Sequence, residues 1–146
     1  MIPQIDSQRA AELMREGHAY VDVRTVEEFR AGHAEGAVNV PAFFRDPLGQ
    51  MAPNPDFVRV MEASFPRDAS LVIGCQAGRR SQMACEFLAS VGYTRLHNIA
   101  GGFGGARDLF GRLSQPGWTQ LGLPVSQVNG DGVSYESIRA RALEEA

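Results

Sequence analysis

SLVIGCQAGRRS, residues 70–81, joins a short apolar run to a polar loop that contains a cysteine, a glycine and two arginines. The apolar run is bounded by polar residues and contains β-branched side chains, which is typical of a buried strand. The segment QMACEFLASV, residues 82–91, follows the loop and carries apolar residues at helical spacing. Cys75 therefore lies where a predicted buried strand passes into a predicted helix.

Strand and helix patterns alternate on both sides of this segment. The predicted strands are 19–23, 37–40, 71–73 and 95–99, and the predicted helices are 7–17, 26–31, 57–63 and the segment after Cys75. Residues 43–56 contain three prolines and one glycine, so we expect a long loop there. We expect a further helix to begin within 101–110, and we find no internal repeat.

This alternation favours an α/β fold with a mostly parallel central sheet and helices on both faces. Ligands of such folds bind beyond the carboxyl ends of the strands, and Cys75 follows such an end. We assign residues 1–128 to one domain. Residues 129–146 are expected to form a C-terminal tail with a short helix that Ser134 caps.

The composition limits the classes of partner. The chain has 146 residues, of which 44% are hydrophobic and 21% charged, which suits one soluble globular domain. A net charge of -3, with no basic run longer than two residues, argues against nucleic acid. We expect a cytoplasmic protein without a membrane segment, because no apolar stretch is long enough. The cysteines and histidines lack metal-ligand spacing, so no metal is expected.

The loop around Cys75 has the features of a nucleophile site. Amide groups at a helix start carry partial positive charge, which favours the thiolate, the form of cysteine that attacks other atoms. Gly78 allows the loop to curl around the sulfur, and Arg79 and Arg80 add charge that can hold an oxyanion. A buried cysteine beside two solvated arginines is the alternative. The combination of strand end, glycine, arginine pair and helix start favours the nucleophile.

Other polar residues are interpreted as structural. A buried aspartate at a strand end more often braces a loop by pairing with an arginine, so we assign Asp22 and Arg24 to structural support. We interpret His33, beside a glycine, as a hydrogen-bonded turn residue. We expect Cys85 to be partly buried at the edge of the helix stripe, with a resolving role for its thiol as the alternative.

Four segments, in this order, resemble the single-domain rhodanese-like sulfurtransferases over about residues 5–125. They are YVDVR with EEF (20–24 and 27–29), GHAEGAVNVP (32–41), CQAGRRS (75–81), and NIAGGF (98–103) with the later GW (117–118) and GLPV (122–125). The third segment matches the family pattern Cys-x-x-Gly-x-Arg-Ser. The resemblance implies a rhodanese-like three-layer fold with a central sheet of about five strands, and a persulfide on Cys75.

The family mechanism implies the roles of the loop residues. The Cys75 thiolate attacks the outer sulfur of thiosulfate or a similar small anionic donor, sulfite leaves, and cyanide or a thiol accepts the sulfur without any further cofactor. The residues assigned to substrate binding are Gln76, Ala77, Gly78, Arg79, Arg80 and Ser81. Backbone amides of this loop are expected to hold the anion, with Arg80 as the main side-chain support. Ser81 is expected to cap the helix, with a hydrogen bond to the loop as the alternative.

One departure from the family and two rival classes remain. The family often has a tryptophan four places after the Gly-Gly pair, where this chain has Ala106; its only tryptophan is Trp118, which indicates an insertion of about twelve residues. Related phosphatases and arsenate reductases have five residues between cysteine and arginine, whereas four separate Cys75 from Arg80. A regulatory module or a protein-to-protein sulfur relay is the other alternative, with another protein as donor or acceptor.

Overall fold

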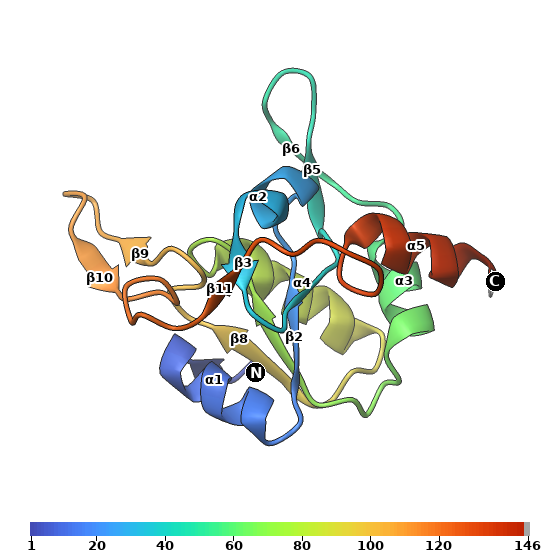
Figure 1. The fold of residues 1–146 in the computed structure, drawn as a ribbon, viewed down its shortest axis with the longest axis horizontal. Helices are drawn as coiled ribbons and strands as arrows, with labels where there is room; N and C mark the ends of the chain where they lie inside the picture. Colours follow the sequence, from blue (N-terminus) through green and yellow to red (C-terminus); the bar gives the residue numbers. More distant parts are fainter. Residues whose placement is uncertain (145–146) are drawn as a thin grey trace.

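A five-stranded parallel sheet forms the centre of the molecule (Figure 1). The computed structural model describes residues 1–144. The strand order is β1-β8-β7-β2-β4, and every pairing in this sheet is parallel. The strands are β1 (Gln4–Ile5), β2 (Ala19–Asp22), β4 (Val38–Asn39), β7 (Leu71–Gly74) and β8 (Leu96–Ile99). The predicted α/β class and the mostly parallel sheet of five strands are confirmed.

Helices cover both faces of this sheet (Figure 1). They are α1 (Ser7–Arg15), α2 (Val26–Ala31), α3 (Phe57–Ser64), α4 (Arg79–Ser90) and α5 (Tyr135–Glu144). Because successive strand residues point to opposite faces, Tyr20 and Val72 pack with α1 and α2, whereas Val21 and Ile73 pack with α3, α4 and α5. Two buried clusters therefore hold the sheet between its helices.

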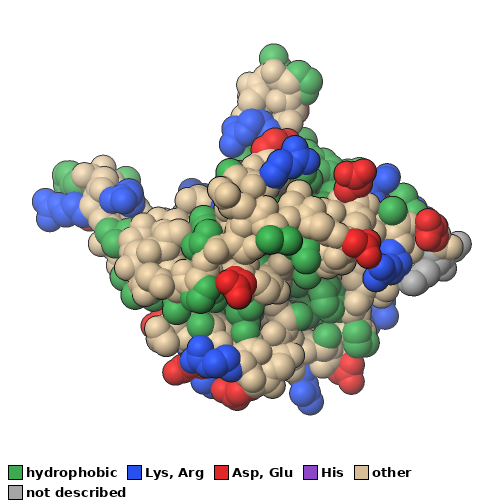
Figure 2. Space-filling model, viewed as in Figure 1, with side chains coloured by type: hydrophobic (Ala, Val, Ile, Leu, Met, Phe, Trp, Pro, Cys, Tyr) green, Lys and Arg blue, Asp and Glu red, His purple; other side chains and the backbone are tan. Residues whose placement is uncertain are grey.

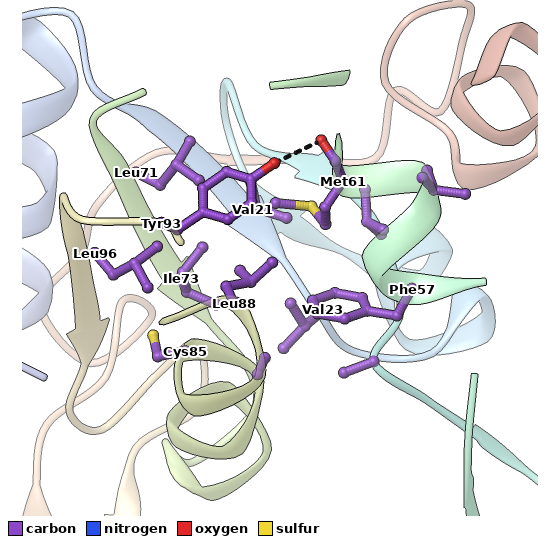
Figure 3. Packing of buried hydrophobic residues seen from close by; sticks show 14 of the residues in the cluster. Val21, Val23, Phe57, Met61, Leu71, Ile73, Cys85, Leu88, Tyr93 and Leu96 are labelled. Atoms are coloured by element: carbon purple, nitrogen blue, oxygen red, sulfur yellow. Dashed lines mark hydrogen bonds between the residues drawn. The ribbon is translucent and has the colours of Figure 1, made fainter. Parts of the chain in front are cut away.

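The larger cluster fixes the helix that follows Cys75 (Figure 3). Ile73 of β7 packs in the same cluster as Met61 of α3 and Leu88 of α4, and all three side chains are fully buried. The hydroxyl of Tyr93 donates to the Met61 carbonyl oxygen at 3.1 Å. Truncating one such core side chain to alanine typically costs about 2–5 kcal/mol. This packing sets the position of α4 and of the loop before it.

Two hairpins lie outside the central sheet. The expected loop 43–56 contains β5 (Phe43–Arg45) paired with β6 (Met51–Pro53). The prediction of a helix that begins within 101–110 is wrong. Turns and a hairpin of β9 (Ala106–Arg107) and β10 (Leu113–Gln115) occupy this region. Its glycines at 101, 102 and 105 have φ of 83°, 53° and 90°, which an α-helix excludes. Elsewhere, β3 (His33–Ala34) pairs with β11 (Val125–Ser126).

Helix α5 lies within the predicted tail 129–146 and packs on the domain. Tyr135 is buried in the larger cluster, and the Asn54 side chain donates to its hydroxyl at 3.0 Å. The Ser134 hydroxyl accepts the amide of Ser137 at 3.3 Å. Residues 145–146 of the predicted tail lie outside the described residues. Within residues 1–144, no helix has the length and hydropathy that crossing a bilayer requires.

Candidate active site

Cys75 follows the last residue of β7 and is 2% exposed. Its Sγ accepts the amide of Gly78 at 3.0 Å and lies 3.3 Å from the Ser81 hydroxyl. Gly78 has φ +114°, and a Cβ added there would meet the backbone of Gly101 at 3.4 Å. Glycine adopts this positive φ without strain, because it has no Cβ. Gly78 therefore allows the loop to curl around the sulfur.

The start of α4 offers further hydrogen-bond donors beside the sulfur. The backbone amides of Gln76, Ala77, Arg79 and Arg80 have no partner among residues 1–144. Amides at the start of a helix carry partial positive charge and are a common binding site for anions. The loop can therefore stabilise negative charge on Cys75 or on an anion bound next to it.

The segment after β8 holds the loop from the carbonyl side. The amide of Phe103 donates to the Cys75 carbonyl oxygen at 2.8 Å, and that of Gly104 donates to the Gln76 carbonyl oxygen at 2.9 Å. A Cβ on Gly102 would overlap the Cys75 carbonyl oxygen. The Gly-Gly pair at 101–102 thus lets two chain segments approach closely enough to fix the position of the nucleophile.

Ser81 bonds the loop and does not cap the helix, so the expected cap is wrong. Gly78 is the N-cap of α4 and makes no side-chain cap bond. The buried Ser81 hydroxyl lies 2.5 Å from Asn98 Oδ1, 3.2 Å from the Gly78 carbonyl oxygen and 3.3 Å from Cys75 Sγ. A hydroxyl has one hydrogen, so these acceptors compete for it.

Asn98 of β8 extends this polar contact toward the surface, and the sequence reasoning missed its role. Its Nδ2 donates to Gln4 Oε1 at 2.7 Å and to the Gly78 carbonyl oxygen at 3.2 Å. The signal was an asparagine beside Ile99 near the end of the predicted strand 95–99. A buried amide of this kind needs partners, and here the partners are the loop and Ser81.

Arg80 forms a two-pronged ion pair with Glu28 of α2. The two guanidinium nitrogens lie 2.7 and 3.0 Å from the carboxylate oxygens. Burial by itself raises the pKa of Glu28, but hydrogen bonds from Arg80 and from Thr25 outweigh it and lower that pKa to about 2. The pair with Glu28 in turn raises the pKa of Arg80. Glu28 was also missed, although Thr25 and Glu28 have the spacing of a capping box, which the structure contains.

Asp22 and Arg24 form a buried ion pair beside the loop. Arg24 donates to the Asp22 carboxylate at 2.9 to 3.1 Å, and both side chains are at most 3% exposed. The same guanidinium donates to the Gln76 side chain at 3.2 Å and lies 4.4 Å from the centre of the Phe103 ring. The pair therefore connects the end of β2 to both segments that surround Cys75.

The remaining candidates lie in other surroundings. The buried His33 ring stacks on Phe29 at 3.7 Å and bonds the Phe29 carbonyl oxygen at 2.8 Å. Arg79 is exposed.

Cys85 is fully buried, not partly buried as expected. Burial, together with the charge of Cys75, raises the pKa of its thiol to about 12. This thiol stays protonated near neutral pH, which disfavours a resolving role.

No metal site is evident in the part of the chain that the structure describes. Within residues 1–144, no three His, Cys, Asp or Glu side chains gather as metal ligands would. His18 and His97, the other two histidines, pack edge to face with ring centres 5.7 Å apart.

Comparison with known proteins identifies the family of this chain. Residues 6–107 match the family described as Rhodanese-like domain. The chain belongs to this family. A rhodanese-like relative, Thiosulfate sulfurtransferase 16, chloroplastic, of Arabidopsis thaliana, is 39% identical over 116 residues, which are 80% of this chain and 86% of the relative. The human Thiosulfate:glutathione sulfurtransferase is 35% identical over 104 residues, which are 69% of this chain and 90% of the relative.

A solved structure confirms the rhodanese-like fold. The crystal structure of Rv0390 from M. tuberculosis has a TM-score of 0.71 and 27% sequence identity, and the match covers 86% of this chain and 98% of that one. The rhodanese-like chain therefore has the fold and the family membership that the four sequence segments imply.

Proposed function

We propose that this protein moves a sulfane sulfur from thiosulfate or a similar small anion to cyanide or a thiol, through a persulfide on Cys75. The observation that carries the proposal is the Cys75 sulfur, held at the start of α4 by the Gly78 amide at 3.0 Å. The names of the Arabidopsis and human relatives, which specify thiosulfate, support this choice of donor.

Each step of this reaction uses groups of the Cys75 loop. The Cys75 thiolate attacks the outer sulfur of thiosulfate, the sulfur–sulfur bond of thiosulfate breaks, and sulfite leaves with the electron pair. Cyanide then attacks the outer sulfur of the persulfide, which forms thiocyanate and returns the electron pair to Cys75. Both steps carry negative charge at the loop. The unpartnered amides of Gln76, Ala77, Arg79 and Arg80 are placed to stabilise it.

Arg80 takes a different part in this proposal than the sequence indicated. Its guanidinium is bound to Glu28, so its charge is compensated beside the loop. Arg79, the residue before Arg80, is exposed. It forms no ion pair with any residue in 1–144. We therefore assign anion binding mainly to the backbone amides, with the exposed Arg79 adding positive charge at the start of α4.

Loop length argues against phosphate chemistry. Four residues separate Cys75 from Arg80, one fewer than in the related phosphatases and arsenate reductases. A shorter ring of amides suits a single sulfur better than a tetrahedral phosphoryl group centred on the thiolate. The proposal therefore predicts no hydrolysis of aryl phosphates and no reduction of arsenate.

The test measures thiocyanate formed from thiosulfate and cyanide. The natural protein should form it, and Cys75→Ser should not, because serine forms no persulfide. Cys85→Ala is the matched control, since it removes the other cysteine and should keep most of the activity. Activity that depends on Cys85, or hydrolysis of 4-nitrophenyl phosphate without thiocyanate formation, would overturn the proposal.

A further inference from the structure

Two hairpin tips of this protein have the same design. RDPLGQM, residues 45–51, and RDLFGRL, residues 107–113, share an arginine, an aspartate and a glycine at equivalent positions, with large apolar residues at two others. The first copy joins β5 to β6, and the second joins β9 to β10.

The hydrogen bonds of the two tips match one by one. The aspartate carboxylate accepts two tip amides in each copy, at 2.9 and 2.8 Å for Asp46 and at 2.8 and 3.0 Å for Asp108. The preceding arginine donates to the carbonyl oxygen of the tip glycine, at 2.7 Å for Gly49 and 3.0 Å for Gly111. Both glycines have positive φ, 82° and 77°. Each tip is therefore ordered by its own bonds.

Self-contained bonding leaves the apolar tip residues free for a partner. Leu48 is 85% exposed and Phe110, at the equivalent position, is 81% exposed. Figure 2 shows the two hairpins as separate projections that carry hydrophobic and arginine side chains. Single exposed apolar residues are common on proteins, but two matched ones on ordered projections are not explained by the packing of this domain.

The sheet order places the two hairpins on opposite sides of the Cys75 loop. β7 precedes Cys75 and lies between β8, which leads to the β9–β10 hairpin, and β2 with β4, which leads to the β5–β6 hairpin. Parallel strands end at one edge of their sheet, so all three connections start there. The Gly104 amide donates to the Gln76 carbonyl oxygen at 2.9 Å. The ring of Phe43 packs against that of Phe87 of α4, with ring centres 6.4 Å apart. Both hairpin bases thus contact the elements that hold Cys75.

The two hairpin tips and the start of α4 carry more arginines than carboxylates, although the chain is acidic. The chain has a net charge of -3, yet four exposed arginines lie on the two tips and at the start of α4, against two aspartates on the tips. The arginines are Arg45, Arg79, Arg107 and Arg112. The surface around the Cys75 loop is therefore complementary to an acidic and partly apolar partner.

The depth of the sulfur limits the shape of that partner. Each hairpin reaches about four residues beyond its base, or roughly 13 Å at the rise of a strand. Cys75 is 2% exposed, and its loop contacts the chain just before the second hairpin through the bond from Gly104 to Gln76. A flat protein face or a membrane resting on both tips would stay too far away for contact with the sulfur. An extended segment that enters between the hairpins would reach it.

We propose that the two hairpins dock an extended acidic segment of a partner protein, in which a cysteine lies between apolar residues and exchanges sulfur with Cys75. This inference rests on the proposed function. The partner thiolate attacks the outer sulfur of the Cys75 persulfide, the sulfur–sulfur bond to Sγ breaks, and the electron pair returns to Cys75 as thiolate. The partner leaves with a persulfide, so no oxidant or reductant is needed.

The experiment compares two synthetic acceptor peptides. Each has a central cysteine with leucine on both sides, flanked by glutamates in one peptide and by lysines in the other. Persulfide-loaded protein should react with the glutamate peptide on the order of tenfold faster, and added salt should reduce this preference. Equal rates for the two peptides would overturn the proposal.

Variants of the tips separate docking from chemistry. The double variant Leu48→Ser, Phe110→Ser should react with the glutamate peptide on the order of tenfold more slowly, while its rate with cyanide stays unchanged. Val128→Ser is the matched control, because Val128 is 70% exposed and lies outside both hairpins. A parallel loss with cyanide, or a loss of binding to phosphatidylglycerol vesicles with no change in peptide rate, would contradict docking of a protein segment.

A binding measurement keeps this inference separate from the proposed function. A fluorescent glutamate peptide with serine in place of cysteine should bind the natural protein, and the tip variant should lose that binding. Peptide binding without persulfide formation would overturn the sulfurtransferase and leave the docking surface. Persulfide formation without peptide binding would overturn the docking surface and leave the sulfurtransferase.

Discussion

Replacement of Glu28 by glutamine removes the charge that holds Arg80 beside the active loop. The carboxylate has a pKa of about 2 against an ordinary value of 4.5. At 1.36 kcal/mol per pKa unit, that difference corresponds to about 3 kcal/mol of folding stability. The side chains of Arg80 and Glu28 are 19% and 29% exposed, and solvent screening reduces the expected loss to about 1–2 kcal/mol.

The pH dependence of this loss has a definite sign. The pKa of Glu28 is lower in the folded protein than in the unfolded chain, so the charge stabilises the fold above about pH 4.5. That contribution is lost as the pH falls from 4.5 toward 2. Urea unfolding should therefore show Glu28→Gln to be less stable than the natural protein at pH 7, with a difference that shrinks as the pH approaches 2.

A double-mutant cycle with Arg80→Ala isolates the pair. Arg80→Ala leaves a half-buried carboxylate without its partner and should also destabilise, and the two changes should couple by about 1 kcal/mol or more. Equal stability of Glu28→Gln and the natural protein at pH 7, or a difference that does not shrink in acid, would refute this reasoning. So would the absence of coupling between the two positions.

Two other substitutions test the supports of the loop. Ser81→Ala leaves Asn98 Oδ1 without its donor and should lower the free energy of unfolding by about 1–3 kcal/mol. It should also slow alkylation of Cys75 by iodoacetamide, because the hydroxyl beside Sγ is lost. An unchanged unfolding free energy together with an unchanged alkylation rate would count against the polar contact. Gly102→Ala places a Cβ on the Cys75 carbonyl oxygen at positive φ and should destabilise by more than about 1 kcal/mol. Gly130→Ala, with open space around it, is its control in the same unfolding experiment.

Local patterns predicted the elements that carry their own signal. The strand before Cys75 and the helix after it follow from one continuous segment, and the loop motif lies between them. β1 was missed because Gln4 and Ile5 become a strand only by pairing with β8, far along the chain. The prediction of a helix within 101–110 failed because Gly101, Gly102 and Gly105 adopt positive φ and form turns.

The same limit applies to the site. Cys75, Gly78 and Arg80 were found because they lie within one short motif. Glu28 is 52 residues away from Arg80, and Asn98 is 17 residues away from Ser81, so no local pattern pairs them. Sequence spacing also could not show that Arg80 is bound to a carboxylate, because such a contact depends on how α2 and α4 pack.

Intact mass spectrometry after incubation with thiosulfate tests the central claim most directly. The natural protein and Cys85→Ala should gain the mass of one sulfur atom, and cyanide should remove it with release of thiocyanate. Cys75→Ser should show neither change. A natural protein that gains no sulfur, or a Cys75→Ser variant that still gains and loses it, would contradict the persulfide on Cys75.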